Sequence, residues 1–257
     1  MIGALCYYLG LVPWTVLAGV VALLIWPLPM RLRARWLALW NHGAIAWLGI
    51  CCGVRYRVHG REHLPETAAV VLCKHQSAWE AIALPKLLPP QSWVLKRELL
   101  WLPFMGWALA IAGAIPIDRS QGTGALRKVL RDGQARLQRG LWVIIFPEGT
   151  RVAPGQKGNY ARSGAQLAVR ANCPIVPIAH NAGLFWPRGS LRKYRGRIDM
   201  VIGEPILPGD RSAAELTQLC ESWIESETKR LLEAAVRESP QLAARYNPDP
   251  TTARSPR

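Results

Sequence analysis

A strand, a turn and the start of a helix are contained in one stretch, Ala69-Val70-Val71-Leu72-Cys73-Lys74-His75-Gln76-Ser77-Ala78-Trp79-Glu80. Its first part, residues 69–73, is an apolar run of the length and composition typical of a buried strand. Its last part fits a capping box, with Ser77 as the helix N-cap and Glu80 in the first turn. The stretch therefore predicts that His75 lies in a short turn between a strand and a helix.

Similar apolar runs recur along the chain and alternate with helical patterns. Between residues 162 and 171 and around residues 126–137, apolar side chains recur at helical spacing. Such alternation predicts an α/β fold with a mixed, largely parallel sheet that helices flank. The expected strands are residues 56–58, 69–73, 93–95, 114–117, 141–146, 175–179 and 198–202.

The C-terminal part begins with a second capping box, Ser212 to Glu215, which opens a last helix. From residue 238 onward Pro, Asn, Asp, Thr and Arg dominate, and this composition predicts a disordered tail at residues 238–257. The predicted buried face of the last helix consists of Leu216, Leu219, Trp223 and Leu231.

The N-terminal part lacks charge from Ile2 to Met30, which is longer than the roughly 20 residues that span a bilayer. Arg31, Arg33 and Arg35 follow and favour a cytoplasmic position for that end. A second weakly charged stretch, residues 36–54, is predicted to lie in the membrane interface, with a second spanning helix as the alternative. We therefore expect a two-helix membrane motif at residues 1–55.

Composition points to a membrane surface as the partner of a basic chain. The net charge is +15, and the 12 Trp against 3 Phe favour the lipid–water interface over nucleic acid, for which no motif is present. The six cysteines form no Cys-x-x-Cys pair and have no metal-ligand spacing. Their scatter through apolar segments fits a reducing compartment, and no metal site is predicted.

His75 and Glu80 admit two interpretations. Glu80 could accept a hydrogen bond from one ring nitrogen and leave the other free to act as a base. Alternatively, Glu80 only caps the helix and His75 is an incidental loop residue. No Gly-x-Ser-x-Gly motif supplies a nucleophile, so a covalent acyl-enzyme is not predicted.

The run Phe146-Pro147-Glu148-Gly149-Thr150-Arg151 predicts an anion site, because Gly149 allows close backbone approach and Arg151 offers a fork that matches phosphate. Asp118-Arg119 and Lys96-Arg97 also follow predicted strands, where ligands gather in parallel sheets. Taken individually, Lys96, Arg97 and Arg119 are better interpreted as solvated surface charges or salt-bridge partners, whereas Arg151 is not. The apolar run 99–107 lies between these basic points. It is either part of the core, the lining of an acyl groove or a lipid contact.

Four blocks in order make the chain resemble the glycerolipid acyltransferases, and specifically the bacterial 1-acyl-sn-glycerol-3-phosphate acyltransferases. The family pattern of His, four residues and Asp is matched by His75 and Glu80, with Glu in place of Asp. The other three blocks are Gly113 to Arg119 ending Ile-Asp-Arg, Phe-Pro-Glu-Gly-Thr-Arg at 146–151, and Ile-Val-Pro-Ile at 175–178. The resemblance covers roughly residues 56–207.

The resemblance implies acyl transfer from acyl-CoA or acyl-carrier protein to the 2-hydroxyl of 1-acyl-sn-glycerol 3-phosphate, which gives phosphatidic acid. In this scheme His75 is the general base, Glu80 orients it, and no metal or redox cofactor is needed. It also implies an inner-membrane location with the catalytic domain, residues 56–237, facing the cytoplasm. The implied substrate-binding residues are Lys96, Arg119, Glu148, Gly149, Thr150 and Arg151.

Two other functions remain open on the sequence. The acceptor could be another lysolipid, such as a lyso-ornithine lipid or a lysophospholipid, because two arginines favour a phosphate monoester without requiring one. The chain could also be a non-catalytic membrane protein that binds lipid on the same fold, although the paired His75 and Glu80 argue against this.

Overall fold

A computed structural model describes residues 2–88 and 90–246, without the side chain of Arg119. Its centre is one seven-stranded sheet in the order β1-β7-β6-β2-β5-β3-β4. All neighbouring strands pair in parallel except β6 and β7, which are antiparallel. The predicted mixed, largely parallel sheet is confirmed, and its strands are β1 (Val54–His59), β2 (Val70–Cys73), β3 (Gln91–Lys96), β4 (Ile115–Ile117), β5 (Trp142–Ile145), β6 (Ile175–His180) and β7 (Gly196–Ile202).

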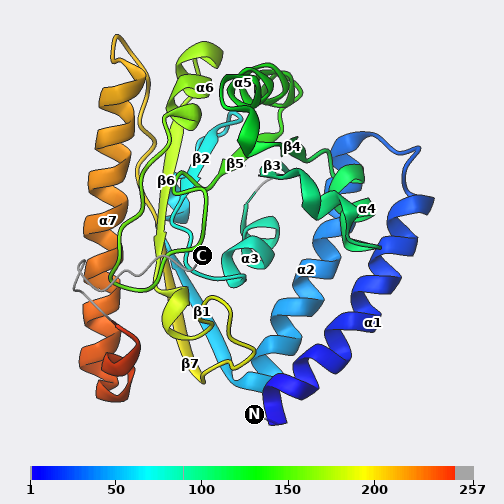
Figure 1. Ribbon diagram of the computed structural model, residues 1–257, viewed down its shortest axis with the longest axis vertical. Coiled ribbons are helices and arrows are strands. Elements are labelled where there is room, and N and C mark those ends of the chain that lie inside the picture. The colour runs from blue at the N-terminus through cyan, green and yellow to red at the C-terminus, as the bar shows by residue number, and fades with distance from the viewer. Residues whose placement is uncertain (1, 89, 247–257) are drawn as a thin grey trace.

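Helices cover both faces of the sheet (Figure 1). Side chains alternate along β2: Val71 packs with α2 (Met30–Cys52) and α3 (Trp79–Leu87), while Val70 and Leu72 pack against the opposite helices. These opposite helices are α5 (Thr123–Gln138), α6 (Ser163–Ala171) and α7 (Ala213–Glu238). Because β2 is buried on both faces, its sequence is uniformly apolar rather than alternating.

The N-terminal segment is a helical hairpin in which α1 (Ile2–Leu24) packs against α2. A Cβ atom at Gly10 would lie 2.3 Å from the Trp47 indole nitrogen, so glycine permits this close approach. Trp47 donates to the Cys6 carbonyl at 3.3 Å, and Trp14 donates to the Trp40 carbonyl at 3.0 Å. These indoles therefore join the two helices, a role that the composition did not predict.

The second helix begins earlier than the predicted residue 36. It starts at Met30, directly after Pro29, and its first turns carry Arg31, Arg33 and Arg35. Proline readily precedes a helix, and arginine is a good helix former. Of the helices in the described residues, α1 alone is long and apolar enough to cross a membrane, by length and composition.

The apolar run 99–107 is on the surface, so its interpretation as core is wrong. It forms η2 (Arg97–Trp101) and α4 (Met105–Ile111), and α4 packs against α1. Trp101 is 69% exposed and Leu102 is 45% exposed. α4 and α1 lie together at one side of the molecule (Figure 1), and α1 also carries exposed apolar side chains.

Two predictions for the C-terminal part need correction. The capping box at Ser212 is confirmed, but Leu219 is 45% exposed and does not belong to the buried face of α7. The predicted disordered tail begins too early, because residues Pro240–Arg245 form the 3-10 helix η5 and Leu242 is buried against the core. The rest of the predicted tail, from residue 247, lies outside the described residues.

Candidate active site

His75 and Glu80 are hydrogen-bonded in the turn between β2 and α3. The His75 Nδ1 atom lies 2.8 Å from Glu80 Oε1, and the Glu80 side chain is fully buried. Because the carboxylate can only accept, Nδ1 carries the proton and the lone pair of Nε2 is available. Among the described residues, none forms a hydrogen bond with His75 Nε2.

Glu80 also accepts hydrogen bonds from the backbone that precedes α3, so its contact with the His75 ring and its contact with the chain coexist. Its Oε1 atom accepts from the backbone nitrogens of Gln76 at 2.9 Å and Ser77 at 2.7 Å. The predicted N-cap is wrong by one residue, because α3 begins at Trp79 after Ala78. Ser77 Oγ accepts from the Trp79 nitrogen and donates to the Trp186 carbonyl, which anchors the turn to another loop.

A second buried histidine lies behind the pair. His180 Nε2 donates to the Lys74 carbonyl at 2.8 Å, and its Nδ1 accepts from the Ala182 nitrogen at 3.2 Å. Burial lowers the pKa of His180, so this ring is neutral. Burial alone raises the pKa of Glu80, but the His180 ring and the hydrogen bonds from His75 and Ser77 lower it on balance. Because His180 is neutral, we attribute most of the lowering to the hydrogen bonds.

The face of the His75 ring rests on Phe146. The two rings are stacked, with centroids 3.9 Å apart and planes 12° from parallel. Phe146 follows β5, the neighbour of β2 in the sheet, so the strand pairing brings the two rings together. The imidazole is thus held by a carboxylate at one edge and an aromatic ring at one face.

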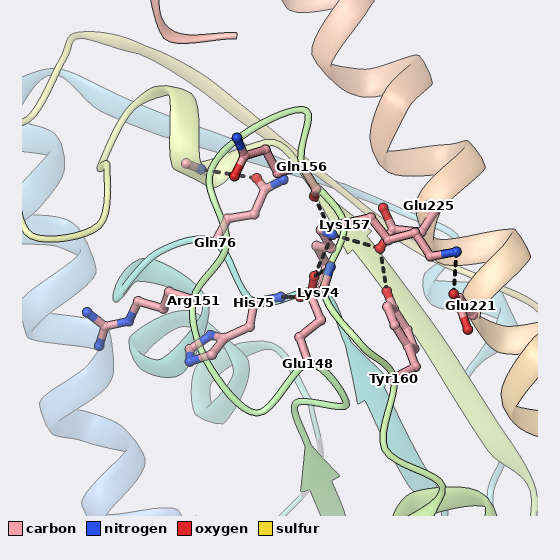
Figure 2. A network of polar contacts seen from close by, with 12 residues as sticks. Lys74, His75, Gln76, Glu148, Arg151, Gln156, Lys157, Tyr160, Glu221 and Glu225 are labelled. Carbon is pink, nitrogen blue, oxygen red and sulfur yellow. Dashed lines mark hydrogen bonds and ion pairs between the residues drawn. The ribbon is translucent and has the colours of Figure 1, made fainter. Parts of the chain in front are cut away.

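Arg151 is brought next to His75 by a backbone hydrogen bond. The Val152 nitrogen donates to the His75 carbonyl at 2.8 Å, and Gly149 makes the preceding turn with a φ of 68°. Positive φ favours glycine at this position. Figure 2 shows the Arg151 and His75 side chains on the same side of the turn. Among the described residues, no hydrogen bond or ion pair joins the Arg151 guanidinium to a partner, and Thr150 beside it is exposed.

Glu148 points the other way, into the protein. Its Oε1 atom accepts from Lys74 Nζ at 2.6 Å and from the Gly158 nitrogen at 3.3 Å, and its Oε2 accepts from the His75 nitrogen at 2.8 Å. Burial raises the pKa of Glu148, and the adjacent Lys74 only partly offsets this. Both oxygens already have partners, so the geometry favours a supporting role for Glu148 over contact with a ligand.

The other predicted basic residues are less closely joined to this turn. Lys96 lies 3.3 Å from Glu98 and is more than half exposed, and no contact between described residues links it to His75 or Arg151. Asp118 pairs with Arg97 at 3.3 Å. Arg119 begins the 3-10 helix η3 (Arg119–Gln121) after β4, and its side chain lies outside the description. The described residues contain no group of three or more His, Cys, Asp or Glu that could hold a metal ion.

Sequence reasoning missed several supporting residues. Lys74 was detectable, because the period of two along β2 places it on the same buried face as Val70 and Leu72. Its partner Glu225, which lies 2.7 Å away on α7, had no local signal. The ring that stacks on His75 and the buried His180 also come from distant segments, so no spacing rule could find them.

Comparison with known proteins identifies the family of the chain. The family described as Acyltransferase matches residues 55–181. A 1-acyl-sn-glycerol-3-phosphate acyltransferase of Pseudomonas aeruginosa is 46% identical over 227 residues, which cover 86% of this chain and 88% of the relative. The alpha form of the same enzyme from Mus musculus is 38% identical over 128 residues, covering 49% of this chain and 45% of that one.

The fold also has a solved counterpart. The crystal structure of the 1-acyl-sn-glycerophosphate (LPA) acyltransferase PlsC from Thermotoga maritima matches with a TM-score of 0.75 at 23% identity, covering 89% of this chain and 94% of that chain. The similarity at this identity concerns the fold. From the Pseudomonas relative and the family match, the chain belongs to the family of 1-acyl-sn-glycerol-3-phosphate acyltransferases.

Proposed function

We propose that the protein transfers an acyl group from acyl-CoA or acyl-carrier protein to the 2-hydroxyl of 1-acyl-sn-glycerol 3-phosphate, giving phosphatidic acid. One observation carries the proposal: a histidine with a free Nε2 is hydrogen-bonded through its own carbonyl to the residue after Arg151. A base and a phosphate-binding cation on two adjoining turns suit an acceptor that carries both a hydroxyl and a phosphate.

The proposed reaction is a direct transfer. His75 Nε2 takes the proton of the 2-hydroxyl as its oxygen attacks the thioester carbonyl. The carbon–sulfur bond then breaks, and the leaving thiolate takes the proton from the imidazolium. Glu80, ionised and buried 2.8 Å from Nδ1, stabilises the imidazolium between these steps. Every proton in this scheme is handled by His75, so we propose that no metal or redox cofactor takes part.

The acceptor phosphate is proposed to bind Arg151, beside the backbone of Gly149 and the exposed Thr150. Lys96 and Arg119 remain candidates for binding the same acceptor phosphate. Glu148, first expected to touch the substrate, is proposed instead to hold the turn, because both of its oxygens face the interior.

The exposed apolar side of α1 and the segment 99–107 support binding to membrane lipids, where the acceptor resides. We propose that residues 1–55 hold the protein on the inner membrane and that the acyltransferase domain, residues 56–237, faces the cytoplasm. A basic chain suits the anionic surface of that leaflet, and we propose no nucleic-acid partner.

The test is an acyltransferase assay of the purified protein in detergent. Lysophosphatidic acid, lysophosphatidylcholine and a lyso-ornithine lipid are offered as acceptors, each with acyl-CoA or acyl-carrier protein as donor. We expect phosphatidic acid as the main product and no product from His75→Ala. Preferred acylation of an acceptor without a phosphate monoester would overturn the assignment, and inactivity with every pair would indicate a lipid-binding protein.

A further inference from the structure

Lys74 is the centre of a buried ionic network that the proposed reaction does not use. Its side chain is completely buried, and its Nζ atom lies 2.6 Å from Glu148 Oε1, 2.7 Å from Glu225 Oε1 and 3.2 Å from the Gln156 carbonyl. An ammonium group has three hydrogens to donate, and all three have acceptors here. Figure 2 shows the network on the opposite side of the turn from the Arg151 and His75 side chains.

The three acceptors come from three separate parts of the chain. Glu148 follows β5, Gln156 lies in the connection 152–162, and Glu225 is in the middle of α7. Lys74 itself directly follows β2, the strand that leads to His75. The Lys74 side chain therefore joins the end of β2 to the segment after the neighbouring strand β5, to the connection 152–162 and to α7.

Both groups proposed to act on the substrate are one contact away from this network. Glu148 Oε2 accepts from the His75 nitrogen at 2.8 Å, and Val152, the neighbour of Arg151, donates to the His75 carbonyl at 2.8 Å. On the far side, the Tyr160 hydroxyl donates to Glu225 at 2.8 Å, so the connection is fastened at both ends. A shift of the ammonium would thus move both His75 and the Arg151 turn.

Stability alone is a weak explanation for such an arrangement. Removing two carboxylates and an ammonium from water is expensive, and buried ion pairs often contribute little net stability compared with apolar residues of similar volume. A fully hydrogen-bonded buried network does, however, specify a single geometry. The spacing between a base and an anion-binding arginine requires this kind of geometric precision.

We propose that Lys74 is a positioning residue for acyl transfer, which fixes the distance between His75 and Arg151 by holding Glu148, Gln156 and Glu225 together. The proposal rests on the acyl-transfer function proposed above. Lys74 is buried away from the His75 and Arg151 side chains, and it acts through Glu148, whose Oε2 accepts from the His75 nitrogen.

The test replaces Lys74 without leaving an additional unpaired charge. Lys74→Met combined with Glu225→Gln removes one cation and one carboxylate, so the net charge of the network is unchanged. The matched control is Lys157→Met with Glu221→Gln, an ion pair that joins the same connection to α7 but has an exposed lysine. Glu225→Gln alone separates the contribution of Lys74 from that of Glu225.

We expect the Lys74 double variant to keep a cooperative thermal transition while its kcat/KM for lysophosphatidic acid falls on the order of 100-fold, with a lower kcat and a higher KM. A misplacement of about 1 Å at a reacting group has an effect of this size. The control and Glu225→Gln alone should stay within about threefold of wild type. Wild-type kcat/KM in the double variant, or an equal loss in Glu225→Gln alone, would overturn the proposal.

Hydrogen–deuterium exchange of residues 147–162 provides a measurement that does not depend on activity. The amides of Val152, Gly158 and Ala161 are hydrogen-bonded in the native turn and report on its order. They should exchange at least about tenfold faster in the Lys74 double variant than in wild type or the control. Unchanged protection would reject the positioning role even if wild type acylates another lysolipid, whereas failure to form phosphatidic acid would reject only the proposed function.

Discussion

The turn that carries His75 lies between two buried carboxylates with different partners. Glu80 accepts from the His75 ring and from the backbone nitrogens of Gln76 and Ser77. Glu148 accepts from the His75 backbone nitrogen and from the ammonium of Lys74. One carboxylate therefore orients the ring, and the other fixes the chain to which the ring is attached.

The pKa values of these two groups shift in opposite directions although burial raises both. For Glu80, the neighbouring His180 and the hydrogen bonds from His75 and Ser77 outweigh burial and lower the pKa. For Glu148, burial outweighs the attraction of Lys74 and the pKa is raised. Glu148 also accepts from two backbone nitrogens, but it shares Lys74 with the Glu225 carboxylate, which raises its pKa further. The charge that matters for the proposed reaction is on Glu80.

The largest effect is expected from His75→Ala, which removes the proposed base. The kcat for phosphatidic acid formation should fall by about 10²–10⁴-fold, the usual contribution of general base catalysis. Steady-state kinetics in detergent would measure it, with thermal unfolding to check the fold. His59→Ala, which changes an exposed histidine on β1, is the matched control and should keep wild-type activity. Full activity of the His75 variant would eliminate the proposed mechanism.

Substitutions of Glu80 separate its two roles. Glu80→Ala should reduce kcat by on the order of 100-fold, because the His75 tautomer and the imidazolium both lose their support. Glu80→Asp should keep substantial activity, since it retains the carboxylate. The same assay compares the variants, and equal rates for Asp and Ala would show that Glu80 serves only as a helix cap.

Arg151→Ala should act mainly on binding of the acceptor. A hydrogen bond between charged groups is worth roughly 1.5–3 kcal/mol, so kcat/KM should fall by about 10- to 100-fold, mostly through the KM for lysophosphatidic acid. The relevant measurement varies the acceptor at saturating donor. Arg127→Ala, at an exposed position on α5, provides the control. An unchanged KM for the acceptor would place the phosphate elsewhere.

The smallest effect is on stability, and its sign should differ between the two carboxylates. The pKa of Glu80 is lowered by folding, so its stabilising contribution is complete above the ordinary pKa of Glu and is lost as pH falls through the folded value. The pKa of Glu148 is raised, so its contribution becomes more favourable as pH falls. Thermal unfolding from pH 7 to pH 3, comparing wild type with Glu80→Gln and Glu148→Gln, should give opposite trends, with the Glu80 change confined to the acid end. Parallel trends would contradict the comparison.

Much of the fold followed from periodicity in the sequence. Every predicted strand is present within a few residues. The central strands β2, β5 and β6 are apolar runs buried on both faces, whereas β1 and β7 alternate between apolar and polar residues. The errors occurred where a local rule competed with tertiary packing. Leu219 has helical spacing but faces outward, and the surface run 99–107 is apolar without belonging to the core. Periodicity identifies an apolar face, but what lies opposite that face depends on the whole chain.

For the site, the sequence by itself determined that His75 and Arg151 follow strands and that Glu80 lies in the first turn of a helix, five residues from His75. The tertiary structure decided which groups surround them: Phe146 under the ring, Lys74 between Glu148 and Glu225, and Val152 bonded to the His75 carbonyl. Each of these contacts joins residues at least 71 positions apart in the sequence, and the contact between Lys74 and Glu225 joins residues 151 positions apart. Their geometry comes from sheet order and helix packing, which short-range spacing does not encode.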